Sequence, residues 1–305
     1  EAYNNLGVAF DKLKNYAQAE KNFNKAIEIS PEFAEAYSNL GSTYTDQKKY
    51  DEAIPCFEKA IQINPINEDA HITLCDLLIQ QKKKEEAILQ LKEFLEINPK
   101  SFLSRHMLGQ LFEEKGQLDE AIESYKLAIE INPNYYPSYN NLGVRYTRLG
   151  EFEKASNTFE KSLRICGNAP KKLLGHGILY YNAGNFFFLK KDLGLARLHF
   201  IEAIKIDNTF IEAMVKKMYL DRLMCDWSEF EKLESELPQL GVTTSSAPPL
   251  EMQTMEDHPQ RQLIRASNRV REKHNEDPIP LPAKPKSKPD KIRIGYFSAD
   301  FHEHP

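Results

Sequence analysis

A repeat of thirty-four residues is the feature that most constrains how this chain can fold. Leu-Gly pairs recur at multiples of that length, and an aromatic residue follows each pair three residues later. Small residues and prolines continue in the same phase. The pairs begin at Leu6, Leu40, Leu108 and Leu142, the small residues are Ala19, Ala53, Ala87, Ala121 and Ala155, and the prolines are Pro31, Pro65, Pro99 and Pro133. Such a period is typical of stacked helical repeats, in which each unit contacts only its neighbours.

Each unit is predicted to form two amphipathic helices. In the first unit Leu6 and Phe10 share one face of the first helix, and Phe23 lies on the inner face of the second helix. Gly7 and Ala19 lack bulk, so they let the two backbones approach closely while the large side chains fill the space beside them. Proline closes the unit because it cannot continue a helix but can begin the next one.

The phase of the repeat divides the chain into units. Five units keep strict phase, although Cys75 replaces the glycine of the third, and a sixth follows after a slip of seven residues. The predicted units are 1–33, 34–67, 68–101, 102–135, 136–169 and 177–210, with a degenerate capping unit at 211–237. Residues 238–290 read as a linker with a helix near 259–271, and residues 291–305 as the first strand and loop of another domain.

The composition argues against several classes of function. Lys and Arg total 40 against 45 Asp and Glu, a net charge of −5, whereas a general nucleic-acid binder usually carries a basic excess. No stretch approaches the roughly 18 consecutive apolar residues that a helix needs to cross a bilayer. From the charge we therefore expect no nucleic acid as a partner, and from the lack of such a stretch no membrane. The four cysteines form no Cys-x-x-Cys motif, and we expect them to be core residues in a reducing cytoplasm, without a metal site.

The repeat resembles the tetratricopeptide repeat over residues 1–169, which implies an all-α, right-handed superhelix whose first helices line a concave face. The residue before each Leu-Gly position is asparagine in four of six units, namely Asn5, Asn39, Asn141 and Asn182, and Thr73 and Met107 occupy the other two. A carboxamide is both donor and acceptor, so this column can bind the backbone of an extended peptide. The alternative is that asparagine is simply a common residue on helix surfaces.

The last residues fit no repeat. Ile292–Phe297 is β-branched and aromatic, which favours the first strand of an α/β domain. Ser298, Asp300, His302 and His304 follow at its carboxyl end, where such folds place their sites. A metal site at His302 and His304 is disfavoured because no further ligand is visible in the sequence.

Three motifs in order resemble those of the protein O-GlcNAc transferases and their bacterial relatives, glycosyltransferase family forty-one. After the repeats come Cys225-Asp-Trp-Ser-Glu-Phe230, a helix introduced by Asp257-His-Pro259, and Lys291-Ile-Arg-Ile-Gly-Tyr-Phe-Ser-Ala-Asp-Phe-His-Glu-His-Pro305. In that family the Cys-Asp-Trp segment closes the superhelix, and the strand opens the first of two Rossmann-like lobes that bind UDP-GlcNAc. Here His302-Glu303 replaces the family's Gly-Asn, but the following His-Pro is kept; the related SPINDLY fucosyltransferases generally lack that proline.

The resemblance implies a role for His304 as a catalytic base or orienting group near the acceptor hydroxyl of Ser or Thr. It also implies UDP-GlcNAc as donor and acceptor proteins as partners, with no cofactor bound in residues 1–305. Glu1 lies inside a helical pattern, so we expect a piece of a longer enzyme, cut at both ends and inactive by itself. The alternatives are a scaffold that binds proteins without catalysis, and transfer of another sugar such as fucose or glucose; a homo-oligomer is left open.

Overall fold

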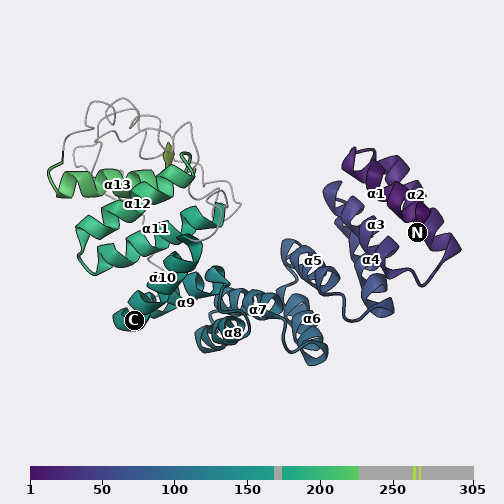
Figure 1. Cartoon of the computed structure of the whole chain (residues 1–305), viewed down its shortest axis with the longest axis horizontal. Coiled ribbons are helices and arrows are strands. Elements are labelled where there is room, and N and C mark those ends of the chain that lie inside the picture. Colours follow the sequence, from purple (N-terminus) through teal and green to yellow (C-terminus); the bar gives the residue numbers. More distant parts are fainter. Residues whose placement is uncertain (168–173, 227–263, 266–267, 269–305) are drawn as a thin grey trace, which may run out of the picture. The chain divides into compact units, whose positions relative to one another are not determined.

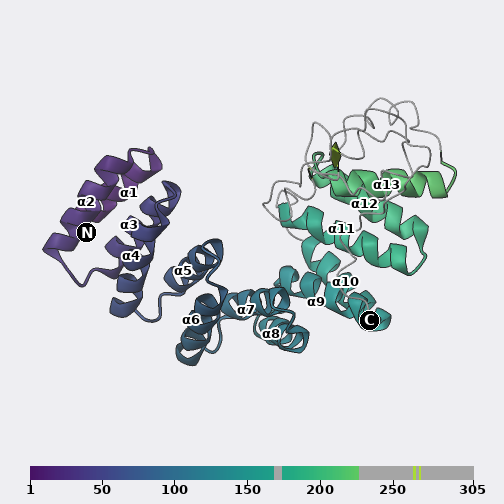
Figure 2. The same cartoon turned by 180° about the vertical axis from the view of Figure 1, so that it is seen from behind.

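The repeat folds as paired α-helices. The computed structural model describes residues 1–167, 174–226, 264–265 and 268, and its first compact unit is Glu1–Cys225 (Figure 1). In that unit the pairs are α1 (Ala2–Lys12) with α2 (Tyr16–Ile29), α3 (Ala34–Asp46) with α4 (Tyr50–Ile63), α5 (Glu68–Gln80) with α6 (Lys84–Ile97), α7 (Phe102–Glu114) with α8 (Leu118–Ile131), α9 (Tyr136–Arg148) with α10 (Phe152–Gly167), and α11 (Leu174–Leu189) with α12 (Leu193–Ile206), followed by α13 (Ile211–Leu223). Figure 2 shows the same pairs from behind.

The prediction of an all-helical array is confirmed for the described residues, which contain no strand. The strand predicted at 291–305 lies outside the described residues, as do nearly all of the linker at 238–290 and residues 227–237 of the predicted capping unit. None of the helices described has the length and hydrophobicity needed to cross a membrane.

A glycine of the first helix meets an aromatic ring of the second helix within five pairs. A Cβ atom built on Gly7 would lie 2.6 Å from the ring of Phe23, and one on Gly41 would lie 2.8 Å from the ring of Phe57. The corresponding distances are 2.7 Å for Gly109 and Tyr125, 3.0 Å for Gly143 and Phe159, and 2.7 Å for Gly184 and Phe200. All five rings are buried. The absence of a side chain therefore lets the ring occupy the space where a Cβ atom would be, in direct contact with the helix backbone.

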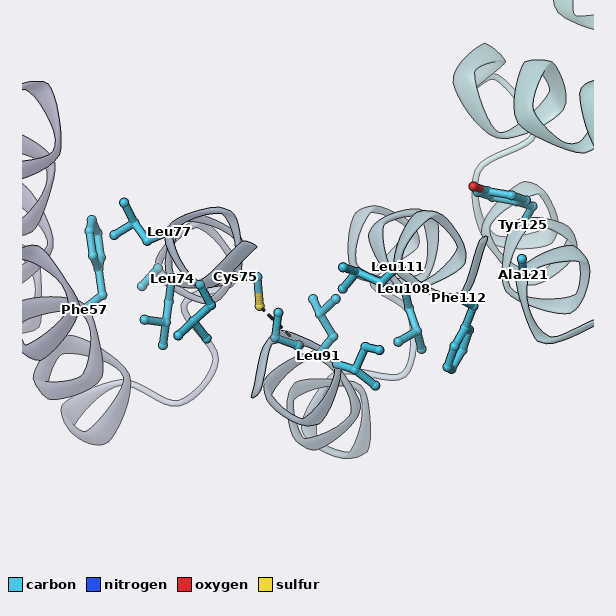
Figure 3. Close-up of a cluster of buried hydrophobic side chains, with 14 of the residues drawn as sticks. Phe57, Leu74, Cys75, Leu77, Leu91, Leu108, Leu111, Phe112, Ala121 and Tyr125 are labelled. Atoms are coloured by element: carbon cyan, nitrogen blue, oxygen red, sulfur yellow. Dashed lines mark hydrogen bonds between the residues drawn. The ribbon is translucent and has the colours of Figure 1, made fainter. Parts of the chain in front are cut away.

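The third pair solves the same packing problem differently. Cys75 occupies the glycine position, and Leu91 replaces the ring that would face it. Both residues are fully buried, and the Cys75 thiol points towards the carbonyl oxygen of Ala87 at 3.7 Å. A larger residue on one helix is thus matched by a smaller one on the other, and the hydrophobic cluster continues without interruption from Phe57 to Tyr125 (Figure 3).

The turn between the helices of a pair contains one residue in the left-handed region. Lysine takes this position at Lys14, Lys48, Lys82 and Lys191, with φ between 56° and 62°, and glycine takes it at Gly116 and Gly150, with φ of 76° and 74°. Only glycine adopts this conformation without steric cost. Short turns of this kind keep the second helix directly against the first.

We expect Gly41→Ala to destabilise the array by about 1–3 kcal/mol, because the added methyl group overlaps the Phe57 ring. Phe57→Leu imitates the natural pair of Cys75 and Leu91 and removes that overlap. In a double-mutant cycle measured by urea unfolding, the combined cost is expected to be at least about 1 kcal/mol smaller than the sum of the single costs. Gly167→Ala is the control, because no atom lies within 4 Å of its built Cβ. Strict additivity would contradict this account of the contact.

Candidate functional site

The ladder is defined as Asn5, Asn39, Asn141 and Asn182, which lie on the first helices α1, α3, α9 and α11. Asn5 is exposed, and the other three are partly buried. The structure does not bring them together as one continuous row. Instead, each of the three partly buried side chains is hydrogen-bonded to an asparagine at the repeat position just before the ladder position. This partner is Asn4 for Asn39, and Asn140 for Asn141 and Asn182.

The first section of the ladder is supported by Asn4. The Asn39 amide donates to Oδ1 of Asn4 at 2.9 Å, and Asn4 in turn donates to Oε1 of Glu35 at 3.0 Å. Asn4 is only 1% exposed. Because its own bonds are made inside the protein, Asn4 acts as a fixed acceptor that orients Asn39 across the boundary between two units.

The second section is supported by Asn140. Asn182 donates to Oδ1 of Asn140 at 3.1 Å, Asn140 donates to Oδ1 of Asn141 at 3.2 Å, and Asn141 donates to the Tyr125 hydroxyl at 3.3 Å. These bonds cross from α11 through α9 to α8. Two ladder amides are thereby held by one buried side chain between them.

The chain of hydrogen bonds ends at an ion pair between buried Arg145 and half-buried Glu113. The Tyr125 hydroxyl donates to Oε2 of Glu113 at 3.1 Å, and Arg145 Nη2 donates to the other oxygen of the same carboxylate at 2.8 Å. Burial, and then the Glu113 charge, raises the pKa of Tyr125, so the phenol stays protonated and remains a donor. Burial also lowers the pKa of Arg145, although its guanidinium is charged at any physiological pH.

The ladder is interrupted in the third and fourth units. The Thr73 hydroxyl donates to the carbonyl of Asp69 in its own helix at 2.8 Å, and Met107 packs against the hydrophobic cluster. His106 occupies the repeat position of Asn4 and Asn140, where it is hydrogen-bonded to the Ser138 hydroxyl at 2.9 Å. These two units therefore offer no carboxamide at the ladder position, and the site consists of two separate sections.

Each section keeps free hydrogen-bonding groups for a ligand. Asn39 and Asn182 each use one N–H inside the protein and retain the other N–H and the carbonyl oxygen. Because the amides are already oriented, less side-chain entropy is lost when a peptide binds. Two sections of this kind can bind two stretches of one extended backbone.

The residues that hold the ladder in place were not predicted from the sequence; they are Asn4, Asn140, Tyr125, Glu113 and Arg145. A signal was present, because the run Asn-Asn-Leu-Gly occurs twice, at Asn4–Gly7 and at Asn140–Gly143. Tyr125 also departs from the phenylalanine found at its position in four other units.

Three further candidates are His304, a metal site and the four cysteines. His304 lies outside the described residues. Within the described part of the chain no three His, Cys, Asp or Glu side chains are grouped as a metal site requires. All four cysteines are free thiols, and burial raises the pKa of Cys56 to about 11, which keeps it an unreactive thiol.

Comparisons with known proteins agree with the repeat architecture. Tetratricopeptide-repeat family models match residues 1–33, 34–67, 91–123, 109–150 and 138–169. No curated protein matches the chain.

Among solved structures, pilF of Pseudomonas aeruginosa is 18% identical with a TM-score of 0.57, and the match covers 71% of this chain and 94% of pilF. The Cut9–Hcn1 hetero-tetramer of the APC/C is 18% identical with a TM-score of 0.56, covering 72% of this chain and 42% of that one. YrrB, a TPR protein with an unusual peptide-binding site, is 26% identical with a TM-score of 0.44, covering 54% and 86%.

The pilF and Cut9–Hcn1 similarities establish the fold alone. Paired helices with a repeated glycine–aromatic contact define a helical-repeat protein. The residues that these family models match, 1–67 and 91–169, consist of tetratricopeptide repeats.

Buried His106 makes the stability of the array depend on pH. Burial lowers its pKa from 6.5 to about 4, so the unfolded chain binds a proton in a range where the folded chain does not. The stability contributed by the neutral ring is complete above pH 6.5 and is lost as pH falls towards 4.

We expect His106→Asn, which installs the residue found at this position in units one and five, to reduce the acid-induced loss of unfolding free energy by up to about 3 kcal/mol. Urea unfolding of both proteins at neutral pH and near pH 4 measures this, and an unchanged difference between the two pH values would contradict it.

Proposed function

We propose that the ladder binds an extended polypeptide through its main chain, and that the chain is the acceptor-binding region of a protein O-GlcNAc transferase-like glycosyltransferase. The observation that carries the binding proposal is the orientation of Asn39, Asn141 and Asn182 by buried or partly buried partners. Carboxamides held in this way can pair with peptide N–H and C=O groups regardless of the peptide's side chains. Such a face suits an enzyme that accepts many proteins.

The glycosyltransferase proposal rests on the order of motifs after the repeats. Cys225–Phe230 follows the array, and the segment 291–305 has the Asp-Phe and His-Pro pairs of the family pattern at its end. In the longer enzyme, the domain that begins at this segment binds UDP-GlcNAc and transfers the sugar to Ser or Thr of the bound protein. His304 is the proposed base or orienting group at the acceptor hydroxyl.

A second candidate is a scaffold that binds proteins and catalyses nothing. It is favoured by the observation that the hydrogen bonds described for the two ladder sections all join residues within 1–167 and 174–226. UDP-GlcNAc turnover by the longer protein separates the two candidates, because a scaffold has none. Turnover of GDP-fucose or UDP-glucose instead would assign a different donor.

Replacing Asn5, Asn39, Asn141 and Asn182 together with Ala is expected to weaken binding of an extended Ser/Thr-rich peptide by a few kcal/mol at most, since a neutral hydrogen bond contributes roughly 0.5–1.5 kcal/mol. Calorimetry measures the affinity, and circular dichroism checks that helical content is kept. The matched control replaces four asparagines outside the ladder, Asn24, Asn64, Asn98 and Asn208. Equal affinities of the two quadruple variants would exclude the ladder as the binding face.

In the full-length enzyme, His304→Ala is expected to lower kcat by on the order of 10²–10⁴, the usual contribution of a positioned acid or base. Peptide affinity is expected to stay within about twofold of wild type, because the ladder carries binding. The 305-residue chain alone is the negative control and is expected to release no UDP. A kcat within about twofold of wild type would remove His304 from the reaction.

A further inference from the structure

A cavity of about 340 Å³ lies between the second helices α8 and α10, with α9 as its floor. Its apolar floor is made by Tyr139, Leu142 and Tyr146, of which the first two are buried. Asn141 projects from α9 at least roughly 100° around the helix from each of these residues. The cavity is therefore separate from the ladder.

Lysines surround the opening of this cavity. Lys126 comes from α8, and Lys154 and Lys161 come from α10, against a single acidic lining residue, Glu130. All three lysines are exposed. Lys154 pairs with Glu151 at 2.6 Å and lies 5.5 Å from the centre of the Tyr146 ring, whereas Lys126 and Lys161 make no ion pair within the described residues. We call this cavity, whose opening is surrounded by Lys126, Lys154 and Lys161, the lysine cavity.

The positive charge is specific to this pair of units. The same three repeat positions hold Asn24, Glu52 and Lys59 between units one and two, Glu58, Glu86 and Glu93 between units two and three, and Lys92, Glu120 and Leu127 between units three and four. The repeat architecture does not require lysine there, since one set is entirely glutamate. The three lysines also stand out in a chain whose net charge is −5.

The shape of the cavity limits what it can bind. Its volume is near the lower end of the roughly 300–1,000 Å³ typical of small-molecule pockets, and much of its lining is exposed side chain, so it cannot enclose a nucleotide or cofactor. It can accept one aromatic or branched side chain on the floor of Tyr139 and Leu142, with flanking carboxylates near the lysines. A nucleic-acid strand would pass the acidic positions of the neighbouring units, which repel phosphate.

We propose that the lysine cavity is a second protein-binding site, which takes an acidic segment of a partner protein and inserts one hydrophobic side chain between α8 and α10. Charge complementarity selects the partner, and the apolar floor fixes its register. Because this site and the ladder lie on different sides of α9, both can be occupied at once. The proposal does not depend on the proposed function.

The probe for the test is the fluorescein-labelled peptide Glu-Asp-Glu-Phe-Asp-Glu-Asp, with fluorescence anisotropy measured on the 305-residue chain. Lys126→Glu with Lys161→Glu is expected to weaken binding by about tenfold or more, because each change replaces attraction with repulsion. The matched control is Lys59→Glu with Lys92→Glu, which makes the same changes at the same two repeat positions of other units and is expected to alter affinity by less than about twofold. Asn157→Trp, at the exposed wall of the cavity, is expected to block binding while all three lysines remain.

The outcomes distinguish this site from its alternatives. Weaker binding at high salt and after replacing the peptide phenylalanine with alanine supports the proposal, as does unchanged affinity in the ladder quadruple variant. No binding at low salt, or equal loss in the two lysine double variants, overturns it. Self-association that is abolished by the Lys126/Lys161 changes alone would assign the cavity to a second copy of the chain and also overturn it. Circular dichroism and thermal unfolding of each variant confirm that the array remains folded.

Discussion

The contact between a glycine on the first helix and an aromatic ring on the second sets the geometry of nearly every unit in the array. Where the Cβ is missing, the ring lies against the helix backbone, and a built Cβ would come within 2.6–3.0 Å of it in five units. Because the same contact recurs, successive first helices present equivalent positions to their neighbours. The hydrogen bonds between Asn39 and Asn4 and between Asn182 and Asn140 depend on this equivalence, since each joins two different units. The packing of the core thus decides which polar side chains can meet.

The helices could be predicted because each unit repeats one apolar pattern with helical spacing. Where the pattern is ambiguous in one unit, the aligned positions of the other units place the helix. The substitution of Cys75 could be seen in the sequence, but its compensation by Leu91 required knowing that the two positions face one another. The turns were harder. Lys14, Lys48, Lys82 and Lys191 adopt a left-handed conformation that lysine does not favour, because the packing of the two helices outweighs the local preference.

The repeat phase predicted the ladder positions, but it could not predict how the amides are used. Whether Asn39 or Asn182 is free or bonded depends on a side chain of a neighbouring unit, which lies more than thirty residues away in sequence and is set by its rotamer. Asn4 and Asn140, for which the repeat phase predicted no role, are only 1% and 7% exposed. The lysine cavity was missed for a similar reason. Lys126, Lys154 and Lys161 are distributed over two helices as solvated charges, and only the position of α9 between those helices shows that they surround one cavity.

A repeat array allows binding surfaces to differ from unit to unit because the core and surface positions of each unit are separate. The same surface positions hold three glutamates between units two and three and three lysines between units four and five, while the small buried position of each of these units stays alanine. Each unit contacts only its neighbours, so a change of surface charge in one groove leaves the packing of distant units unaltered. The polar chain from Asn182 to Glu113 is the exception, because its five bonds join α11, α9, α8 and α7. A substitution at Tyr125 or Asn140 consequently reaches both sides of the second ladder section, whereas a substitution at Lys161 affects only the cavity that it lines.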